Sequence, residues 1–145
     1  MYYSAMNSTT ASQLSFFKLL GAAHAIEDRL ESSLAEVGLS SAKFGALNQL
    51  VQAKEPLSLS ELAAKVACVR SNITQLVDRL ESDGLVRRVS DPEDRRSVRA
   101  EVTPLGKERH SAGAVRVEAI QRAFAETIGE VDKEALERAF ASLKC

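Results

Sequence analysis

Residues 70–106 have the sequence RSNITQLVDRLESDGLVRRVSDPEDRRSVRAEVTPLG, and their hydrophobic pattern changes at Gly84. Before this glycine, apolar side chains recur at the spacing of a helix. After it, the runs LVRRV and SVRAEV are short and β-branched, and the second one alternates, which is typical of strands. Gly84 suits the left-handed end of a helix, and Asp91-Pro92 suits the first two positions of a type I turn. The stretch therefore predicts one helix followed by a β-hairpin.

The predicted helix has an apolar and a polar face. Its apolar face consists of Ile73, Leu76, Val77 and Leu80. On or near the opposite face stand Arg70, Ser71, Asn72, Thr74, Gln75 and Arg79. No acidic residue precedes Asp78 in this helix, so its front half is polar and carries only the charge of Arg70.

Three more helices are predicted before this stretch. Residues 12–37 carry apolar side chains at spacings of three, four and seven, and Gly38 is suited to end that helix. Ser40 can cap the next helix. Ser58 and Glu61 have the spacing of a capping box, which predicts the start of a short helix.

Two helices are predicted after the hairpin. Thr103-Pro104 predicts the start of a long helix to about Ile128, and Asp132 predicts the cap of the last one. The opening residues MYYSAMNSTT are expected to form a flexible tail. The expected organisation is a tail at 1–11 and a single domain at 12–145, with a lobe at 39–103 between terminal helices at 12–37 and 104–145.

Composition is that of an ordinary globular protein. The chain has 145 residues, of which 45% are hydrophobic and 27% charged, and a net charge of −1. This charge argues weakly against nucleic acid, although the local arrangement of Lys and Arg matters more. No apolar run reaches the roughly 20 residues that span a bilayer, and the N-terminus lacks the pattern of a signal peptide. Because the only cysteines are Cys68 and Cys145, a reducing cytoplasm is the expected location.

The order of the elements predicts a mainly α (α+β) fold of the winged helix-turn-helix type. In such a fold the polar helix enters the major groove of DNA, where small and amide side chains can bond to base edges or phosphates. The hairpin lies beside it and can reach the minor groove, whose negative potential attracts arginine. We therefore expect Asp91-Pro92 to fix the turn, Asp94 to hold a guanidinium, and Arg95 or Arg96 to enter the groove.

Each of these features also has a simpler interpretation. The turn can be a solvated loop whose opposite charges cancel. Arg87, Arg88 and Arg99 can be the solvated face of a small sheet, and the polar helix face can be ordinary surface. The DNA interpretation is favoured because the features occur together, in the order that DNA binding requires.

Residues 70–108, RSNITQLVDRLESDGLVRRVSDPEDRRSVRAEVTPLGKE, resemble the core of the MarR family (multiple antibiotic resistance regulators). The likeness extends over essentially the whole chain, and the run LVDRLE…GLVRR…DPxDRRS…TPLG is its most specific part. The resemblance implies an obligate homodimer, in which interleaved terminal helices carry two winged-helix lobes. It also implies a regulator, usually a repressor, that binds a short inverted repeat of double-stranded DNA and is released by a small phenolic or aromatic ligand or by oxidation.

The resemblance also implies which residues contact DNA. In the family the wing Asp and the second Arg of the DRR run act together, and these correspond to Asp94 and Arg96. The family reads bases from the front of the recognition helix, which corresponds to Arg70, Ser71, Asn72, Thr74 and Gln75. Apart from the resemblance, Arg79 on that helix and Arg88 and Arg95 on the wing are also expected to contact DNA. The chain departs from the family pattern at two places. Val69 stands where a Ser N-cap is common, and Val102 stands where Leu is usual.

A homodimer is also expected on physical grounds. The first helix and the last two carry more apolar residues than one lobe can cover, namely Phe17, Leu20, Ile120, Phe124, Ile128, Leu136 and Phe140. A two-fold dimer would place its two recognition helices on half-sites one turn of DNA apart, which is roughly 10 bp.

The effector pocket is expected between the dimer helices and the lobe, as in the family. Its candidate lining residues are Phe16, Phe17, His24, Phe44 and Leu47, for each of which core packing is the alternative. Cys68 is expected to be a buried packing residue, although a nearby arginine and helix N-terminus can lower a thiol pKa. His24 and His110 have no second ligand at metal spacing, so no metal or other cofactor is expected.

The expected function is that of a sequence-specific, ligand-responsive transcriptional regulator that binds an inverted repeat as a homodimer. No nucleophile, paired carboxylate or phosphate loop occurs in a convincing setting, so an enzyme is not expected. The alternative is a winged-helix module for protein interaction or dimerisation without DNA binding.

Overall fold

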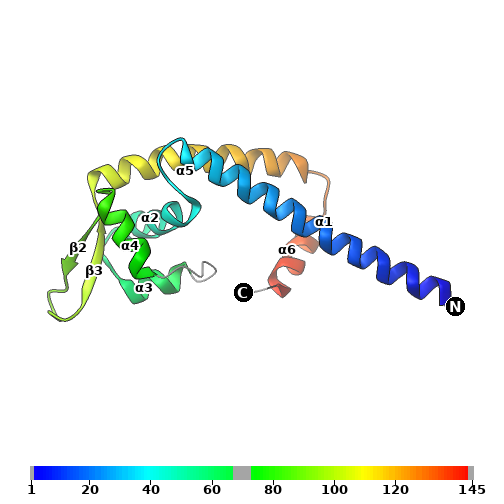
Figure 1. Cartoon of the computed structure of the whole chain (residues 1–145), viewed down its shortest axis with the longest axis horizontal. Coiled ribbons are helices and arrows are strands. Elements are labelled where there is room, and N and C mark those ends of the chain that lie inside the picture. Colours follow the sequence, from blue (N-terminus) through cyan, green and yellow to red (C-terminus); the bar gives the residue numbers. More distant parts are fainter. Residues whose placement is uncertain (1, 67–72, 144–145) are drawn as a thin grey trace.

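The computed structural model describes residues 2–66 and 73–143, with their side chains from residue 15 onward. In chain order its elements are α1 (Tyr2–Ala35), α2 (Ser41–Ala53), β1 (Leu57–Ser58), α3 (Leu59–Lys65), α4 (Ile73–Ser82), β2 (Val86–Ser90), β3 (Val98–Val102), α5 (Pro104–Thr127) and α6 (Lys133–Ser142). Figure 1 shows α2, α3, α4 and the β2–β3 hairpin gathered into a lobe at one end of the molecule. From this lobe α5 and α1 extend together, and α6 folds back near the far end of α5. This is the predicted winged helix-turn-helix architecture.

The sheet is antiparallel, with the strand order β1-β3-β2. The hairpin pairs Val86 with Val102 at its base and Ser90 with Val98 near its tip. Strand β1 is an addition to the predicted elements, and its Leu57 lies opposite Ala100 in the centre of β3. Ala100 is buried, whereas Val98 is 42% exposed because the hairpin there projects beyond the lobe. The wing, which consists of β2, β3 and the loop between them, therefore contacts the core only through the half nearer its base.

One leucine-rich cluster forms the core of the lobe. Its buried members are Leu34, Leu39, Ala46, Leu47, Leu50, Leu57, Leu62, Leu76, Val77, Leu80, Leu85, Val86 and Ala100. They come from the end of α1, from α2, α3 and α4, and from the sheet. Because α4 and the hairpin share this core, the two are held in a fixed spatial relation at their bases.

Local capping chemistry sets several helix boundaries as predicted. The side chain of Ser40 accepts a hydrogen bond from the backbone of Lys43 and caps α2. Ser58 and Glu61 form a complete capping box at the start of α3. Gly38 and Gly84 follow their helices with φ of 74° and 76°, which is the left-handed conformation that glycine adopts without strain.

The N-terminal segment differs from the prediction. Residues 1–11 were expected to be a flexible tail, but α1 begins at Tyr2. No glycine or proline occurs before Gly21, so nothing in this stretch interrupts a helix once it has formed.

Candidate nucleic-acid interface

Helix α4 buries one face in the lobe and leaves the other open. Leu76, Val77 and Leu80 are buried, and Ile73 packs partly against the core. The predicted contact residues Thr74, Gln75 and Arg79 are exposed, together with Asp78. The predicted contacts Arg70, Ser71 and Asn72 lie outside the described residues, as do Cys68, Val69 and Cys145. The described part of the face is therefore polar, with a cation toward its C-terminal end.

The tip of the wing is shaped by two aspartates. The hydrogen-bonded reversal runs from Asp94 to Ser97, whose N–H donates to the Asp94 carbonyl oxygen at 3.0 Å. The prediction placed the turn at Asp91-Pro92. Asp91 instead accepts the N–H of Glu93 on its side chain at 3.0 Å, which is an Asx turn. Asp91 and Asp94, each with Asx-turn geometry, thus form together the bend that a single type I turn was expected to form.

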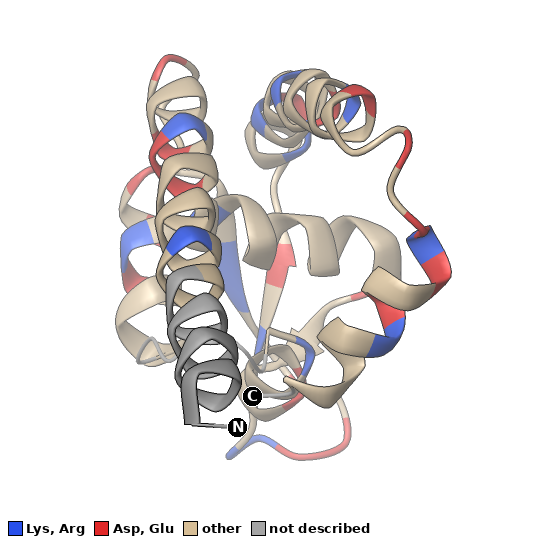
Figure 2. Cartoon of the chain, turned by 90° about the vertical axis from the view of Figure 1, so that its right-hand side faces the viewer, with Lys and Arg blue, Asp and Glu red and all other residues tan. Residues whose placement is uncertain are grey.

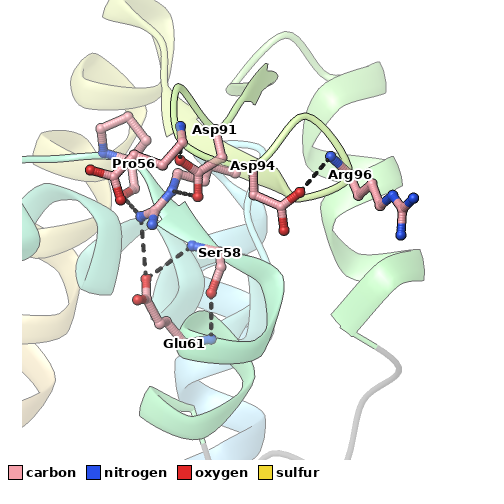
Figure 3. Close-up of polar contacts among 8 residues, drawn as sticks. Pro56, Ser58, Glu61, Asp91, Asp94 and Arg96 are labelled. Atoms are coloured by element: carbon pink, nitrogen blue, oxygen red, sulfur yellow. Dashed lines mark hydrogen bonds and ion pairs between the residues drawn. The ribbon is translucent and has the colours of Figure 1, made fainter.

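Asp94 and Arg96 are linked, but not as the sequence suggested. The N–H of Arg96 donates to Asp94 Oδ1 at 3.0 Å, so the carboxylate holds the backbone and not the guanidinium. Figure 3 shows the Arg96 side chain pointing away from the rest of the cluster. Arg95 and Arg96 are both exposed. The expected contact between Asp94 and a guanidinium is therefore wrong: Asp94 binds the Arg96 backbone, and the Arg96 guanidinium points away from it.

Arg88 is engaged within the lobe. Its Nη2 donates to Asp78 Oδ1 at 2.5 Å and its Nη1 to Glu81 Oε1 at 2.9 Å. The Arg88 N–H also donates to Glu81 Oε2 at 3.1 Å. The hydrogen bond to Asp78 is the main reason why the pKa of Arg88 is raised. Arg88 was predicted to contact DNA, and the structure places it between the wing and α4, where it joins them.

Arg99 is a site residue that the sequence did not single out. Its Nε donates to Asp91 Oδ2 at 3.2 Å, and its Nη1 donates to the Pro56 carbonyl oxygen at 3.2 Å. The same Nη1 lies 3.6 Å from Glu61 Oε2. The pKa of Asp91 is lowered first by the N–H of Glu93 and then by this guanidinium. Sequence spacing alone gives no sign of this cluster, because its members lie up to 43 positions apart.

Charges of both signs are interspersed over the molecule (Figure 2). Near the wing, Asp91 and Glu101 are neutralised by internal partners, whereas Glu93 and Asp94 at the tip are exposed. Arg87, for example, pairs with Glu101 at 2.6 Å while its own side chain stays 67% exposed. The net charge of the chain is therefore a poor guide to this surface, where Arg79, Arg95 and Arg96 are exposed.

The candidate pocket residues are not brought together within the single chain. Phe16 and Phe17 contact each other edge to face on the exposed surface of α1, where His24 is also exposed. Leu47 is buried in the core. Phe44 stacks on His110, with ring centroids 5.3 Å apart, and His110 Nε2 lies 2.9 Å from Asn48 Oδ1. His110 was considered only as a metal ligand, and its burial lowers its pKa.

A cavity of about 390 Å³ lies elsewhere, at the base of the wing. It is lined by Leu50, Val51, Lys54, Glu55, Pro56, Glu101, Val102 and Lys107. Among the described side chains, no group of three or more potential metal ligands occurs. No helix in the described part of the chain is both long and apolar enough to cross a membrane.

These elements define a winged helix-turn-helix protein, and comparison with known proteins gives the family. The sequence profile of the MarR family matches residues 39–98. The chain is 37% identical over 95 residues to the transcriptional repressor YetL of Bacillus subtilis, covering 65% of this chain and 57% of YetL. It is 31% identical over 98 residues to the transcriptional regulator MhqR of the same organism, covering 67% of each.

Solved structures agree with this result. The transcriptional repressor CouR bound to a 23-mer DNA duplex superposes with a TM-score of 0.78 at 26% identity, covering 92% of this chain and 94% of CouR. A probable transcriptional regulator from Pseudomonas aeruginosa gives 0.76 at 25% identity, covering 88% and 95%. The chain belongs to the MarR family. It spans between about one third and two thirds of the length of the curated relatives it matches.

Proposed function

We propose that the protein is a transcriptional repressor that binds an inverted-repeat DNA operator as a homodimer. The observation that carries this proposal is the pairing of two exposed elements. The polar face of α4 lies beside a wing whose Asp94 holds the backbone of Arg96 and leaves its guanidinium pointing outward. The relatives named as transcriptional repressors, and the DNA duplex bound by CouR, support the same conclusion.

The two elements suit the two grooves of B-DNA. Helix α4 exposes Thr74 and Gln75 in its first turns, and hydroxyl and amide groups can bond to base edges in the major groove. Arg95 and Arg96 lie at the end of a hairpin that projects beyond the lobe, and a guanidinium there can enter a narrow minor groove. Arg79 is exposed farther along α4 and can contact phosphate.

The homodimer is supported by apolar surface away from the lobe. The exposed large apolar residues of α1 and α5 are Phe16, Phe17, Leu19, Leu20, Ile26, Leu105, Val115 and Phe124, and those of α6 and its C-cap are Phe140 and Leu143. Helix α6 buries none of its residues. Exposed apolar side chains that gather into a patch typically mark an interface. We infer that α1, α5 and α6 form the dimer body and that residues 39–103 form the DNA-binding lobe.

A small organic effector completes the proposal. The cavity at the base of the wing has a volume of about 390 Å³, which is within the range of roughly 300–1,000 Å³ found for ligand pockets. Its wall combines apolar side chains with two lysines, Lys54 and Lys107, and two acids, Glu55 and Glu101. Because Glu101 is paired with Arg87, the lysines remain available to the carboxylate of an aromatic acid. Salicylate should raise the melting temperature of the wild-type protein and should do so less in Lys107→Ala, because binding to the native state alone stabilises it.

The test of DNA binding starts from a random duplex library. Purified protein is used to select duplexes from the library. The affinities for the most enriched duplex and for a scrambled duplex are then compared by fluorescence anisotropy at one salt concentration. The proposal predicts an inverted repeat with half-sites about 10 bp apart and a clear preference over the scramble. Selection of no consensus, together with stable co-purification of another protein, would support the interaction module instead.

Arg96→Ala is the matching variant. Loss of a groove contact costs about 1–3 kcal/mol, and the dimer loses two of them, so affinity should fall by roughly 30-fold or more. The melting temperature should stay within a few degrees of wild type because the side chain is exposed. Wild-type affinity in this variant would contradict the role of the wing.

A further inference from the structure

We propose that Arg99 is a positioning residue, which sets the direction of the wing relative to the helix-turn-helix without touching DNA. This inference rests on the proposed function, since it concerns how the same interface is held in shape. It assigns a role to a side chain that would otherwise be taken as part of the solvated face of the sheet.

Arg99 joins three parts of the chain that the wing must be aligned with. Through Nε it holds Asp91 Oδ2, at the start of the wing loop. Through Nη1 it contacts the Pro56 carbonyl oxygen and Glu61 Oε2, at 3.2 and 3.6 Å. These two acceptors lie just before β1 and in the first turn of α3. The guanidinium therefore connects the wing loop directly to the entrance of the helix-turn-helix.

Both ends of this connection are themselves fixed. Asp91 closes the wing loop, since its N–H donates to the Ser97 carbonyl oxygen at 3.1 Å. Glu61 belongs to the capping box, where its Oε2 accepts the N–H of Ser58 at 3.0 Å. Figure 3 shows this chain of contacts running from the capping box through the guanidinium to the base of the wing loop. A displacement of α3 is thereby passed to the loop that carries Arg96.

The wing needs such a connection because its tip has little other support. Residues 92–96 are all exposed, and only Asp91 and Ser97 in this loop are partly covered. The side chains of Arg99 and Asp91 are 29% and 14% exposed, so their ion pair is shielded more than most surface pairs. Partly exposed pairs contribute little to global stability. The effect of Arg99 is therefore expected in the order of the loop and not in the folding of the lobe.

Arg88 supports the hairpin on the opposite face of the sheet. Val89 pairs with Arg99 and Arg88 pairs with Ala100, so Arg88 and Arg99 occupy adjacent rows of the ladder. Adjacent rows point to opposite faces. Arg88 holds α4 from one face, and Arg99 holds the α3 entrance from the other. The hairpin is thus tied to both helices of the helix-turn-helix, α3 and α4.

The first experiment measures the free protein and does not depend on DNA. Backbone NMR order parameters are compared for wild type, Arg99→Gln and Arg87→Gln. Arg87 is the matched control, because it lies on the neighbouring strand and pairs only with Glu101 among the described contacts. We expect order at residues 93–97 to fall in Arg99→Gln alone, with α3 and α4 unchanged. An unchanged loop in Arg99→Gln overturns the proposal.

The second experiment is a double-mutant cycle on the selected duplex. Arg99→Gln should weaken binding about 10-fold in the wild-type background and less than 2-fold in the Arg96→Ala background, because coupled residues are not additive. Equal losses in both backgrounds would mean that Arg99 acts independently of the wing tip, which contradicts the proposal. If wild type selects no duplex, the proposed function fails, whereas the NMR comparison still decides the role of Arg99.

Discussion

Gly106→Ala should destabilise the protein at the junction of the wing and α5. A Cβ at this position would lie 2.0 Å from the Leu85 carbonyl oxygen and 2.7 Å from Cγ2 of Val102. The same Leu85 oxygen accepts the N–H of Thr103 at 3.0 Å, so it cannot move away freely. The Thr103 hydroxyl in turn accepts the N–H of Gly106 and donates to the Gly84 carbonyl oxygen. The close approach therefore involves backbone on both sides.

The size of the stability loss in Gly106→Ala is the balance of two unfavourable contributions and one favourable contribution. Overpacking costs about 1–3 kcal/mol, and loss of a backbone hydrogen bond costs about 0.5–1.5 kcal/mol. The higher helix propensity of alanine returns at most about 1 kcal/mol. The net loss is roughly 2 kcal/mol, which corresponds to a fall in melting temperature of about 4–8 °C for a protein of this size.

Gly45→Ala in α2 is the matched control. Apart from its own helix backbone and chain neighbours, no atom of the described residues lies within 4 Å of its added Cβ. The helix should therefore gain about 0.5–1 kcal/mol. Both variants are unfolded in urea at the same protein concentration, because the stability of a dimer depends on concentration. A Gly106→Ala variant as stable as wild type, or two variants that shift alike, would refute the steric argument.

Three further predictions concern charge, pH and assembly. Arg88→Met should lower stability by less than about 1 kcal/mol but weaken operator binding more than 10-fold, because Asp78 and Glu81 would lose their cation. Anisotropy titrations that match wild type would count against this prediction. Burial lowers the pKa of His110 below 6.5, so its stabilising contribution is present above that pH and is lost as the pH falls through the lowered native value. The urea midpoint of wild type should therefore fall as the pH is lowered from 7.5 to 5, and the midpoint of His110→Phe should fall less. Phe124→Ser should shift sedimentation from dimer toward monomer, and an intact dimer at micromolar concentration would be the contrary result.

The parts of the fold that could be predicted are those fixed by local chemistry. The capping box at Ser58 and Glu61 needs only residues three positions apart, and Gly84 needs only its own freedom at positive φ. The apolar face of α4 follows from helical spacing alone. The separation of its exposed residues Thr74 and Gln75 from the core was predictable for the same reason.

What the sequence could not give depends on contacts between distant residues. Strand β1 has two residues, too few for a pattern, and exists because Leu57 pairs with Ala100. The contact between Arg99 and Pro56 spans 43 positions. Arg88 was predicted to contact DNA, because nothing in the sequence indicates that the fold places two carboxylates of α4 beside it. Sequence spacing within one element could not identify these arginines as internal supports.

Hydroxyl-radical footprinting of the selected duplex tests the central claim most directly. In the proposed complex, a wing arginine enters the minor groove on each outer side of the two major-groove contacts. Wild type should therefore give two symmetric minor-groove protections, and these should disappear with Arg96→Ala. The protections at the two central major-groove contacts should remain in that variant at saturating protein. Identical footprints for the two proteins, or protection of a single half-site, would contradict this claim.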